Sequence, residues 1–491
     1  MPSGDAKGSL SMKLKELLSG IPVLSATADM ETEITNVSYN SRETRPGDLF
    51  VAMTGFATDG HKFIGKAREA GAAAVLCEQT PEDGIPYVRV ENSRRALAVI
   101  GANFFGHPAA DMVMTAVTGT NGKTTTTYLL KAVLEQAKGT KVGLIGTNQN
   151  MIGDQVLPTE RTTPESFEVQ KLFAEMRSAG CTHVVMEVSS HALYLDRVYG
   201  VHYEVGIFTN LTQDHLDFHR TMEAYCDAKA ILFRNCGVGV YNADDPWAER
   251  LMQGATCRKF SYARAADADL RAENIDLSSD HVAFDAVTKD ERVKIRVGIP
   301  GGFMVYNTLD VLGAAMQLGV PLSESASILA KVPHVRGRVE VVPTPGKDYT
   351  ILIDYAHSPD GLSNVLSSVK EFSRGRTVAV FGCGGDRDKT KRPKMGKIAS
   401  DIADFAVVTS DNPRTEVPGD IIQDILAGME DAKIPYVVME DRVEAIHWAM
   451  DHAESGDVIV LCGKGHETYQ VVGTVKHHMD EREIVADWLR Q

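Results

Sequence analysis

The deciding stretch of this sequence is Val117-Thr118-Gly119-Thr120-Asn121-Gly122-Lys123-Thr124-Thr125. It lies between an apolar run at residues 112–117 and a helix-like run at 126–137, so it predicts a strand, a glycine turn and the start of a helix. Backbone N–H groups in such a turn converge on phosphate oxygens, the lysine reaches the terminal phosphates, and the Thr124 hydroxyl can hold Mg²⁺. An ordinary glycine turn needs no Lys-Thr pair where the helix begins. We therefore predict a nucleoside-triphosphate site formed by Gly119, Thr120, Asn121, Gly122, Lys123, Thr124 and Thr125.

Length and composition limit what the chain can be. With 491 residues it is too long for one hydrophobic core, and about three domains are expected. Hydrophobic residues make up 43% of the chain and charged residues 24%, as in a soluble globular protein. The net charge of −15 argues against a general nucleic-acid binder, whose binding surface would be basic.

The cysteines and apolar runs indicate the cellular location. The 7 cysteines are scattered without a Cys-x-x-Cys pair, which favours reduced thiols over disulfides or a zinc site. Residues 1–11 lack the apolar core of a signal peptide, and no apolar run is long enough to cross a bilayer. We therefore expect a cytoplasmic protein that does not bind membranes.

The strand and helix patterns predict three α/β units, at residues 1–111, 112–334 and 335–491. In the middle unit short strands alternate with helices, as a parallel sheet with crossover helices requires. The pattern restarts near residues 335–338, which we interpret as a hinge. The predicted strands are 36–41, 48–52, 73–77, 142–145, 184–188, 205–208, 238–241, a meander at 267–300, and 350–354, 377–381, 405–409 and 458–461. Predicted helices outside the phosphate-loop helix are 13–19, 61–70, 307–318, 360–372, 393–402, 419–430 and 441–453.

The phosphate loop departs from the usual pattern at Val117, where a glycine is standard. The version Thr-Gly-Thr-Asn-Gly-Lys-Thr-Thr at residues 118–125 is typical of the Mur ligases and the related folylpolyglutamate synthetases, which this chain resembles. The resemblance covers essentially the whole chain. It implies a central P-loop parallel-sheet ATPase domain between an N-terminal uridine-nucleotide-binding domain and a C-terminal dinucleotide-fold-like domain. In the N-terminal domain, the Ser41-Arg42 pair matches the family's nucleotide contact, which implies that Ser41 binds the uridine nucleotide substrate.

Three further residues of the middle unit are candidate metal ligands together with Thr124. Glu187 ends an apolar strand candidate and precedes small hydroxyl residues, so its carboxylate is well placed to hold Mg²⁺ beside the terminal phosphate. The resemblance matches His215 to a histidine at a second magnesium. It matches Lys229 to a lysine that CO₂ converts to a carbamate, which can bind metal. Lys123, His215 and Lys229 are therefore the expected catalytic residues.

The resemblance also implies contacts to a UDP-muramoyl-dipeptide substrate and to ATP. The expected dipeptide contacts, besides Ser41, are Thr162, Thr163, Ser189 and Arg197, and the further ATP contacts are Asn307, Arg338 and Asp354. The chain departs from the family pattern at Arg161, Leu195 and Met304, where relatives can carry Asn, Gln and Asn.

Three segments of the last unit, at residues 381–389, 411–414 and 463–467, carry the chemistry of a second amino-acid substrate. Arg387 and Arg414 can hold a carboxylate by paired hydrogen bonds, while Asp411 and Glu467 can accept hydrogen bonds from an ammonium group. A diamino-dicarboxylic acid offers both groups at its far end. Asp-Asn-Pro-Arg at 411–414 resembles the motif of muramoyl-tripeptide synthetases that add meso-diaminopimelate. The expected binding residues are Arg387, Asp411, Asn412, Pro413, Arg414, Gly463 and Glu467.

The resemblance therefore implies an ATP- and Mg²⁺-dependent ligase that attaches diaminopimelate to the muramoyl dipeptide through an acyl phosphate, in peptidoglycan precursor synthesis. We expect it to act on small molecules as a monomer. Two alternatives stay open from the residues. A folylpolyglutamate synthetase would share the phosphate loop and its chemistry, but it would not explain residues 1–111 or the motif at 411–414. A regulatory protein that hydrolyses ATP only as a switch would not need Glu187, His215 and Lys229.

Overall fold

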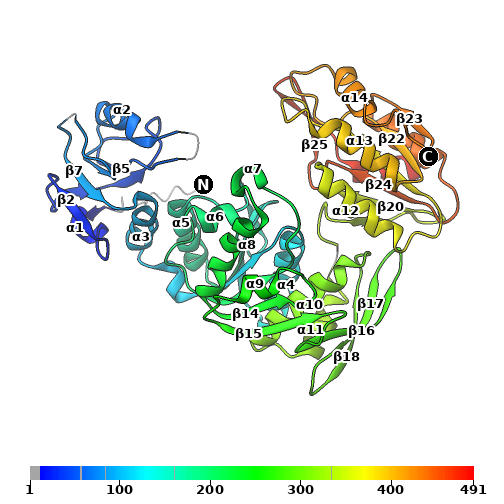
Figure 1. The fold of residues 1–491 in the computed structure, drawn as a ribbon, viewed down its shortest axis with the longest axis horizontal. Helices are drawn as coiled ribbons and strands as arrows, with labels where there is room; N and C mark the ends of the chain where they lie inside the picture. Colours follow the sequence, from blue (N-terminus) through cyan, green and yellow to red (C-terminus); the bar gives the residue numbers. More distant parts are fainter. Residues whose placement is uncertain (1–10, 56–57, 83, 160, 333, 491) are drawn as a thin grey trace, which may run out of the picture.

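The computed structural model describes residues 11–490 apart from 56–57, 83, 160 and 333. These residues form three α/β units, each built on its own main sheet. The N-terminal and C-terminal units lie at opposite ends of the molecule, with the middle unit joining them (Figure 1). The predicted α/β class with three units is confirmed.

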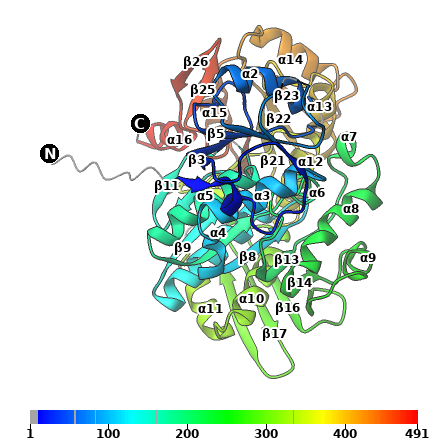
Figure 2. The ribbon, with the colours of Figure 1, turned by 90° about the vertical axis from the view of Figure 1, so that its left-hand side faces the viewer.

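The N-terminal unit contains a sheet of five strands in the order β2-β7-β6-β5-β4, with only β2 antiparallel to its neighbour. Helix α3 packs on α5 of the middle unit, where Phe104 and Phe105 contact Phe167. Figure 2 shows these two helices side by side. The elements are β1 (Met12–Lys13), α1 (Leu14–Leu17), β2 (Val23–Ala26), β3 (Glu33–Ile34), β4 (Asn36–Ser38), β5 (Asp48–Val51), α2 (Ile64–Glu69), β6 (Ala74–Cys77), β7 (Tyr87–Val90) and α3 (Ser93–Phe104).

The middle unit is built on an 11-stranded sheet in the order β11-β10-β9-β12-β8-β13-β14-β15-β16-β17-β18. The strands are β8 (Val113–Thr118), β9 (Lys141–Ile145), β10 (Asn150–Ile152), β11 (Gln155–Leu157), β12 (Cys181–Glu187), β13 (Tyr203–Phe208), β14 (Cys236–Asn242), β15 (Arg258–Ala263), β16 (Leu270–Leu277), β17 (Val282–Val287) and β18 (Arg292–Val297). The helices are α4 (Lys123–Lys138), α5 (Ser166–Ser178), α6 (Ser190–Tyr194), α7 (Leu216–His219), α8 (Met222–Ala230), α9 (Ala248–Met252), α10 (Phe303–Gln317) and α11 (Leu322–Leu329).

The predicted parallel sheet is present from β9 to β16, but antiparallel strands extend it at both ends. The predicted meander at 267–300 corresponds to β16, β17 and β18, which continue the same sheet rather than forming a separate layer. The hairpin of β10 and β11 was not predicted. Its two strands have only three residues each, too few for a hydrophobic period to be visible.

Strand β8 occupies the topological switch point of this sheet. It pairs with β12 on one side and with β13 on the other, and all three strands are parallel. In this register Glu187 pairs with Val117, and Phe208 pairs with Thr118. The carboxyl ends of the three strands therefore meet at one place, which is where ligands bind in open α/β sheets.

The C-terminal unit has a six-stranded sheet in the order β19-β20-β24-β21-β22-β23, parallel except for β19. All four predicted strands of this unit are present, while β19, β23 and the hairpin of β25 and β26 were not predicted. The elements are β19 (Glu340–Val342), β20 (Thr350–Asp354), α12 (Pro359–Lys370), β21 (Thr377–Phe381), α13 (Lys391–Ile402), β22 (Phe405–Val408), α14 (Pro418–Leu426), β23 (Tyr436–Val438), α15 (Arg442–Asp451), β24 (Val458–Cys462), β25 (Tyr469–Val472), β26 (Val475–His478) and α16 (Glu481–Leu489).

The middle and C-terminal units share one continuous cluster of buried apolar residues, which includes Leu309, Val335 and Leu366. The seven cysteines are all free thiols. Within the described part of the chain, every helix is too short or too polar to span a bilayer.

Asp310 is a fully buried carboxyl group between α10 and α4 of the middle unit. Burial raises its pKa well above the ordinary value of 3.8, although Thr126 Oγ1 donates a hydrogen bond to its Oδ2 at 3.4 Å. The folded state thus binds this proton more tightly than the unfolded state. The free energy of unfolding should therefore fall as the pH rises above about 3.8, until the carboxyl group ionises in the folded protein as well.

We predict that Asp310→Asn stabilises the protein at pH 8, because the amide avoids the cost of a buried charge. Thermal unfolding followed by circular dichroism should show a Tm increase of about 2 °C or more at pH 8 and a smaller one at pH 5. Asp290→Asn, at an exposed hairpin position, is the control and should change neither value. A lower Tm for Asp310→Asn at pH 8 would contradict the prediction.

Candidate active site

The phosphate loop after β8 requires glycine at two positions. A Cβ atom on Gly119 would lie 1.8 Å from Thr209 Oγ1, and one on Gly122 would lie 2.4 Å from Asn307 Oδ1. Both residues also have positive φ angles, 149° and 87°, which L side chains rarely adopt. The loop is therefore enclosed by the residues after β13 on one side and by α10 on the other, and this places Asn307 at the loop.

The segment after β13 fixes the shape of this loop. Asn210 accepts hydrogen bonds from the N–H groups of Thr120 (2.8 Å, through its carbonyl) and Asn121 (3.0 Å, through Oδ1). The Thr209 hydroxyl donates to the Asn121 carbonyl at 2.6 Å. Neither residue was among the sites predicted from the sequence. The sequence feature that could have indicated Thr209 and Asn210 is their position directly after a buried strand, β13.

Lys123 and Lys229 meet at one backbone oxygen. Lys123 Nζ donates to the carbonyls of Gly119 and Thr120, both at 2.9 Å, and Lys229 Nζ donates to the Gly119 carbonyl at 2.9 Å. Lys229 comes from α8 and is buried, with 1% of its surface exposed. Burial and the charge of Lys123 lower the pKa of Lys229 well below 10.5. Burial also lowers the pKa of Lys123, although the negative charge of Glu187 acts to raise it.

A cavity of about 140 Å³ opens over the phosphate loop. The predicted residues that line it are Thr120, Asn121, Gly122, Lys123, Thr124, Thr125, Thr162, Glu187 and Arg338, and Thr147 completes the wall. Glu187 is fully buried at the end of β12 and accepts hydrogen bonds from Thr147 N (3.0 Å) and Thr147 Oγ1 (2.9 Å). The structure thus brings the predicted phosphate, lysine and carboxylate groups together in one cavity.

His215 lies at the start of α7 in a left-handed backbone conformation, with φ 53°. Its ring packs edge-on against His191 and Tyr225, at centroid distances of 4.8 and 6.0 Å. Lys229 Nζ lies 4.5 Å from the centre of the same Tyr225 ring. Burial lowers the pKa of His215, although the negative charge of Asp214 acts to raise it. Two of the predicted metal ligands, His215 and Lys229, therefore both contact the Tyr225 ring.

Thr163 connects the residues expected to bind the muramoyl dipeptide. Its hydroxyl donates to the Glu187 carbonyl at 2.8 Å and accepts from the N–H of Ser189 at 3.2 Å, and its carbonyl accepts from Arg197 Nη1 at 3.1 Å. Thr162 shares a hydroxyl hydrogen bond of 2.9 Å with Thr147. These four predicted residues thus surround the end of β12. Ser41 lies apart from them, in the turn after β4 of the N-terminal unit.

The three departures from the family pattern have different surroundings. Arg161 is an exposed side chain paired with Glu165 at 3.3 Å. Leu195 ends α6. Met304 is buried in α10, and its sulfur accepts from Asn307 Nδ2 at 3.8 Å, so it orients the amide beside the phosphate loop.

The predicted hinge contributes Arg338 to the cavity over the phosphate loop. Arg338 Nη2 lies 3.4 Å from Thr124 Oγ1, and its guanidinium group packs over the Tyr355 ring at 5.5 Å. Asp354 accepts hydrogen bonds from the N–H groups of Val339 (2.8 Å) and Ala356 (2.9 Å). Burial raises its pKa. Arg338 therefore reaches the nucleotide site, while Asp354 holds the backbone of the hinge.

In the C-terminal unit, the loops after β21, β22 and β24 converge. Arg414 has a left-handed backbone conformation with φ 51°, and its Nη1 donates to the Gly385 carbonyl at 2.8 Å. A Cβ atom on Gly384 would lie 2.9 Å from Arg414 Nη1 and 3.9 Å from Arg387 Cγ. The two predicted carboxylate-binding arginines thus flank Gly384. The left-handed conformation strains the backbone of a non-glycine residue, and strained residues of this kind are common at functional sites.

The predicted ammonium-binding residues lie beside these arginines. Asn412 Nδ2 donates to Glu467 Oε2 at 2.9 Å, and the Gly385 N–H donates to the Asn412 carbonyl at 2.9 Å. Gly463 lies against Asp411, whose Oδ2 would be 2.5 Å from a Cβ atom there. A Cβ atom on Gly385 would likewise lie 1.9 Å from the carbonyl oxygen of Pro413. Sequence reasoning missed Lys464, which donates to Asn412 Oδ1 at 2.6 Å from a fully buried position.

No group of three or more His, Cys, Asp or Glu side chains suited to a metal ion occurs in the part of the chain that the structure describes. Thr124 and Glu187, however, line one cavity with hydroxyl and carboxylate oxygens. Hard oxygen donors of this kind fit Mg²⁺, which usually takes one or two carboxylates together with substrate phosphates. The donors are therefore compatible with a metal shared between the protein and a bound nucleotide.

Comparison with known proteins gives one consistent result. Residues 33–105, 117–315 and 337–465 match, respectively, the "Mur ligase family, catalytic domain", the "Mur ligase middle domain" and the "Mur ligase, glutamate ligase domain". A Clostridium botulinum protein named UDP-N-acetylmuramoyl-L-alanyl-D-glutamate--2,6-diaminopimelate ligase is 47% identical over 465 residues, which cover 94% of this chain and 96% of that protein.

A Clostridium acetobutylicum protein with the same name, numbered 1, is also 47% identical, over 98% of this chain and 100% of its own. A solved structure of UDP-N-acetylmuramoyl-L-alanyl-D-glutamate--2,6-diaminopimelate ligase superposes with a TM-score of 0.72 at 30% identity, covering 98% of this chain and 99% of that chain.

We predict that Lys123→Ala slows nucleotide turnover on the order of 100-fold or more, the scale on which loss of one preorganised charge-stabilising group acts. The measurement is the rate of ADP release at saturating ATP, with circular dichroism to verify folding. Lys138→Ala, an exposed lysine in the last turn of the same helix, is the control and should keep the wild-type rate. Near-wild-type turnover of Lys123→Ala would place the terminal phosphate elsewhere.

Proposed function

This chain belongs to the Mur ligase family of ATP-dependent amide ligases, and we propose that it adds meso-2,6-diaminopimelate to UDP-N-acetylmuramoyl-L-alanyl-D-glutamate. Relatives named for this reaction match it over almost its full length. The observation that carries the proposal is the group of charged side chains where three loops of the C-terminal unit meet. There, two arginines flank Gly384 while Asp411 and Glu467 lie on the adjacent loops.

The proposed reaction has two steps. The γ-phosphoryl group of ATP passes to the side-chain carboxylate of the D-glutamate, which gives an acyl phosphate and ADP. The diaminopimelate amine then attacks the acyl carbon, loses a proton, and displaces inorganic phosphate through a tetrahedral intermediate. Lys123, held at the loop by two carbonyls, would neutralise charge that develops on the transferred phosphoryl group.

Thr124, Glu187, His215 and a carbamate on Lys229 would hold Mg²⁺ at this site. Magnesium would neutralise phosphate charge and orient the transferred group. The protein residues fix where that happens, because Glu187 is buried and held by Thr147, and Thr163 fixes the end of β12. The uridine nucleotide would reach Ser41, while its dipeptide would extend toward Thr162, Ser189 and Arg197.

The carbamate on Lys229 would form when the unprotonated amine attacks CO₂ and releases one proton to water. Two properties of Lys229 support this step. Its lowered pKa increases the fraction of the neutral, nucleophilic amine. The neighbouring Lys123 ammonium would then attract the negative carbamate, because both lysines share the Gly119 carbonyl.

The far end of diaminopimelate carries one carboxylate and one ammonium group. Arg414 and Arg387 suit the carboxylate, and Asp411 and Glu467 suit the ammonium group. Lysine lacks that carboxylate and would leave the arginines without a partner, so the pocket should discriminate against it. We also propose that the enzyme is a monomer in the cytoplasm that acts on small molecules alone.

A single assay tests this function against the two alternatives. ADP release is measured with the muramoyl dipeptide in the presence of meso-diaminopimelate, L-lysine or a folate, and without an acceptor. The proposal requires release that depends on both the dipeptide and diaminopimelate. Dependence on folate would indicate a folylpolyglutamate synthetase, and release without any acceptor would indicate an ATP-hydrolysing switch.

For the carbamate, we predict that Lys229→Ala nearly abolishes ligation while the fold stays intact, and that added short-chain carboxylates partly restore the rate. Independently of activity, wild type in ¹³C-bicarbonate should show a carbamate resonance in its NMR spectrum that Lys229→Ala lacks. The control, Lys294→Ala on an exposed strand position, should retain both activity and resonance. Full activity of Lys229→Ala, or a resonance that persists in it, would remove the carbamate from the mechanism.

For the amino-acid substrate, we predict that Arg414→Ala strongly raises the KM for diaminopimelate and barely changes the KM for ATP. Loss of a charge-assisted pair of this kind costs roughly 2–5 kcal/mol of apparent binding. Arg414→Lys should recover only part of the loss, because lysine keeps the charge without the paired geometry.

The kinetic comparison includes Arg374→Ala, at an exposed position of the same unit, which should match wild type. Diaminopimelate kinetics that survive Arg414→Ala, or a wild type that uses lysine equally well, would show that the substrate assignment is wrong.

A further inference from the structure

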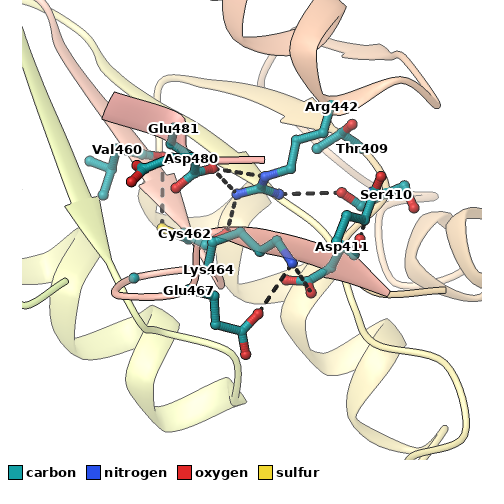
Figure 3. A network of polar contacts seen from close by, with 12 residues as sticks. Thr409, Ser410, Asp411, Arg442, Val460, Cys462, Lys464, Glu467, Asp480 and Glu481 are labelled. Atoms are coloured by element: carbon teal, nitrogen blue, oxygen red, sulfur yellow. Dashed lines mark hydrogen bonds and ion pairs between the residues drawn. The ribbon is translucent and has the colours of Figure 1, made fainter. Parts of the chain in front are cut away.

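Lys464 is a fully buried lysine beneath the proposed amino-acid pocket. Its Nζ donates to Asn412 Oδ1 at 2.6 Å. It also donates to Glu467 Oε2 at 3.2 Å and lies 3.8 Å from Asp411 Oδ1 (Figure 3). Asn412 in turn donates to the same Glu467 oxygen at 2.9 Å. Each of the three side chains, Lys464, Asn412 and Glu467, is therefore hydrogen-bonded to the other two.

This set leaves part of Glu467 free for a ligand. Both internal hydrogen bonds go to Oε2, and among the described residues Glu467 Oε1 has no hydrogen bond. The Asn412 amide is held from both ends, because its oxygen also accepts from the N–H of Val471 at 2.8 Å. Glu467 is thus the member of the set that can contact a substrate, while Asn412 and Lys464 fix its position.

The charges of the set match one ligand ammonium group. With the adjacent Asp411 included, the set has two carboxylates, Asp411 and Glu467, and one ammonium group, Lys464, so its net charge is about −1. A buried charge is tolerated only when it is paired. One ammonium group from a substrate would neutralise the remaining charge. Without Lys464, two carboxylates would face that single ammonium group and repel each other.

A second buried cation holds the two loops that supply this set. Arg442 donates to the carbonyl of Ser410 (3.4 Å) and to the carbonyl of Cys462 (2.8 Å), which directly precede Asp411 and Gly463. It also pairs with Glu481 at 2.8 Å, and both side chains are fully buried (Figure 3). The loops after β22 and β24 are therefore fixed to each other at their bases.

Strand β21 lies between β22 and β24, so these loops can meet only across its end. Gly382 follows β21, and a Cβ atom there would lie 2.2 Å from the Thr409 carbonyl oxygen. The absence of a side chain at Gly382 lets the loops approach, and Lys464 then spans from one to the other.

We infer that Lys464 is a positioning residue for substrate specificity: it holds Glu467 in the orientation that receives the distal ammonium group of a diamino acid. This inference rests on the proposed function of the pocket and goes beyond it, because Lys464 acts through Glu467 and Asn412 without touching the substrate. Its removal should weaken amino-acid binding selectively. The phosphate loop and the expected dipeptide contacts lie on the other two units, so the KM values for ATP and for the dipeptide should be unaffected.

The test is steady-state ADP release by the full-length enzyme for wild type, Lys464→Met, Glu467→Gln and the double variant Lys464→Met/Glu467→Gln. Lys464→Met should raise the KM for meso-diaminopimelate about tenfold or more, the scale on which members of one hydrogen-bond network couple. The KM for ATP, the KM for the muramoyl dipeptide and kcat should stay near wild type. Lys397→Met, an exposed lysine of the same unit, is the matched control and should change nothing.

The double variant tests whether Lys464 acts through Glu467. Because the effect of Lys464 passes through that carboxylate, the double variant should have nearly the same KM for the amino acid as Glu467→Gln alone. It also removes the unpaired buried charge, so it remains informative if Lys464→Met fails to fold. Unchanged amino-acid KM in a folded Lys464→Met, losses that add fully in the double variant, or equal losses for all three substrates would overturn the inference.

The wild-type control separates this inference from the proposed function. Wild type is first assayed with meso-diaminopimelate and with L-lysine. If it prefers lysine, the assignment of diaminopimelate fails, and the variants are then compared with lysine, whose distal ammonium group still tests Lys464.

Discussion

The carbonyl oxygen of Gly119 accepts hydrogen bonds from both Lys123 and Lys229, and the chemistry of the middle unit depends on this shared contact. It is possible only because Gly119 has no side chain, since the Thr209 hydroxyl occupies the space where one would lie. The contact brings a lysine from α4 to a lysine from α8, more than a hundred residues later. Burial of both ammonium groups favours loss of a proton from one of them, and Lys229, the more deeply buried, has the more strongly lowered pKa.

The two substrate-binding units use the same topology with opposite electrostatics. In each, parallel strands deliver their loops to one edge of a sheet, and a glycine after a central strand makes room for its neighbours. The middle unit uses Gly119 and Gly122 to expose backbone N–H groups and lysines to an anion. The C-terminal unit uses Gly382 and Gly384 to bring carboxylates and arginines together, so it suits a zwitterionic group. Phosphate carries charge of one sign only, whereas an amino-acid end group needs partners of both signs at fixed positions.

Sequence patterns predicted the features that depend on neighbours along the chain. The phosphate loop, the β-branched parallel strands and Glu187 at a strand end are all local signals, and the structure places them as expected. The roles of Asn210, Arg442 and Lys464 could not be predicted, because each depends on partners in other loops. Lys464 has the local pattern of a solvated loop lysine, and only the convergence of β22 and β24 buries it. Strands β2 and β23 were missed for another reason than length, because the equally short β5 and β6 were predicted. Strands β5 and β6 are fully buried, whereas β2 and β23 lie at the edges of their sheets and are mostly exposed.

The hinge explains how the two units can cooperate in one reaction. In the proposed reaction, the amine held by the C-terminal unit would have to reach an acyl group formed over the phosphate loop, so the units would have to approach each other during the cycle. The hinge backbone belongs to the C-terminal unit, because Asp354 holds Val339 and Glu340 accepts from the N–H of Gly337. The Arg338 side chain extends the other way, to Thr124 at the phosphate loop. Any movement of the amino-acid pocket therefore also moves a cation at the nucleotide site, which physically connects occupation of one site to the geometry of the other.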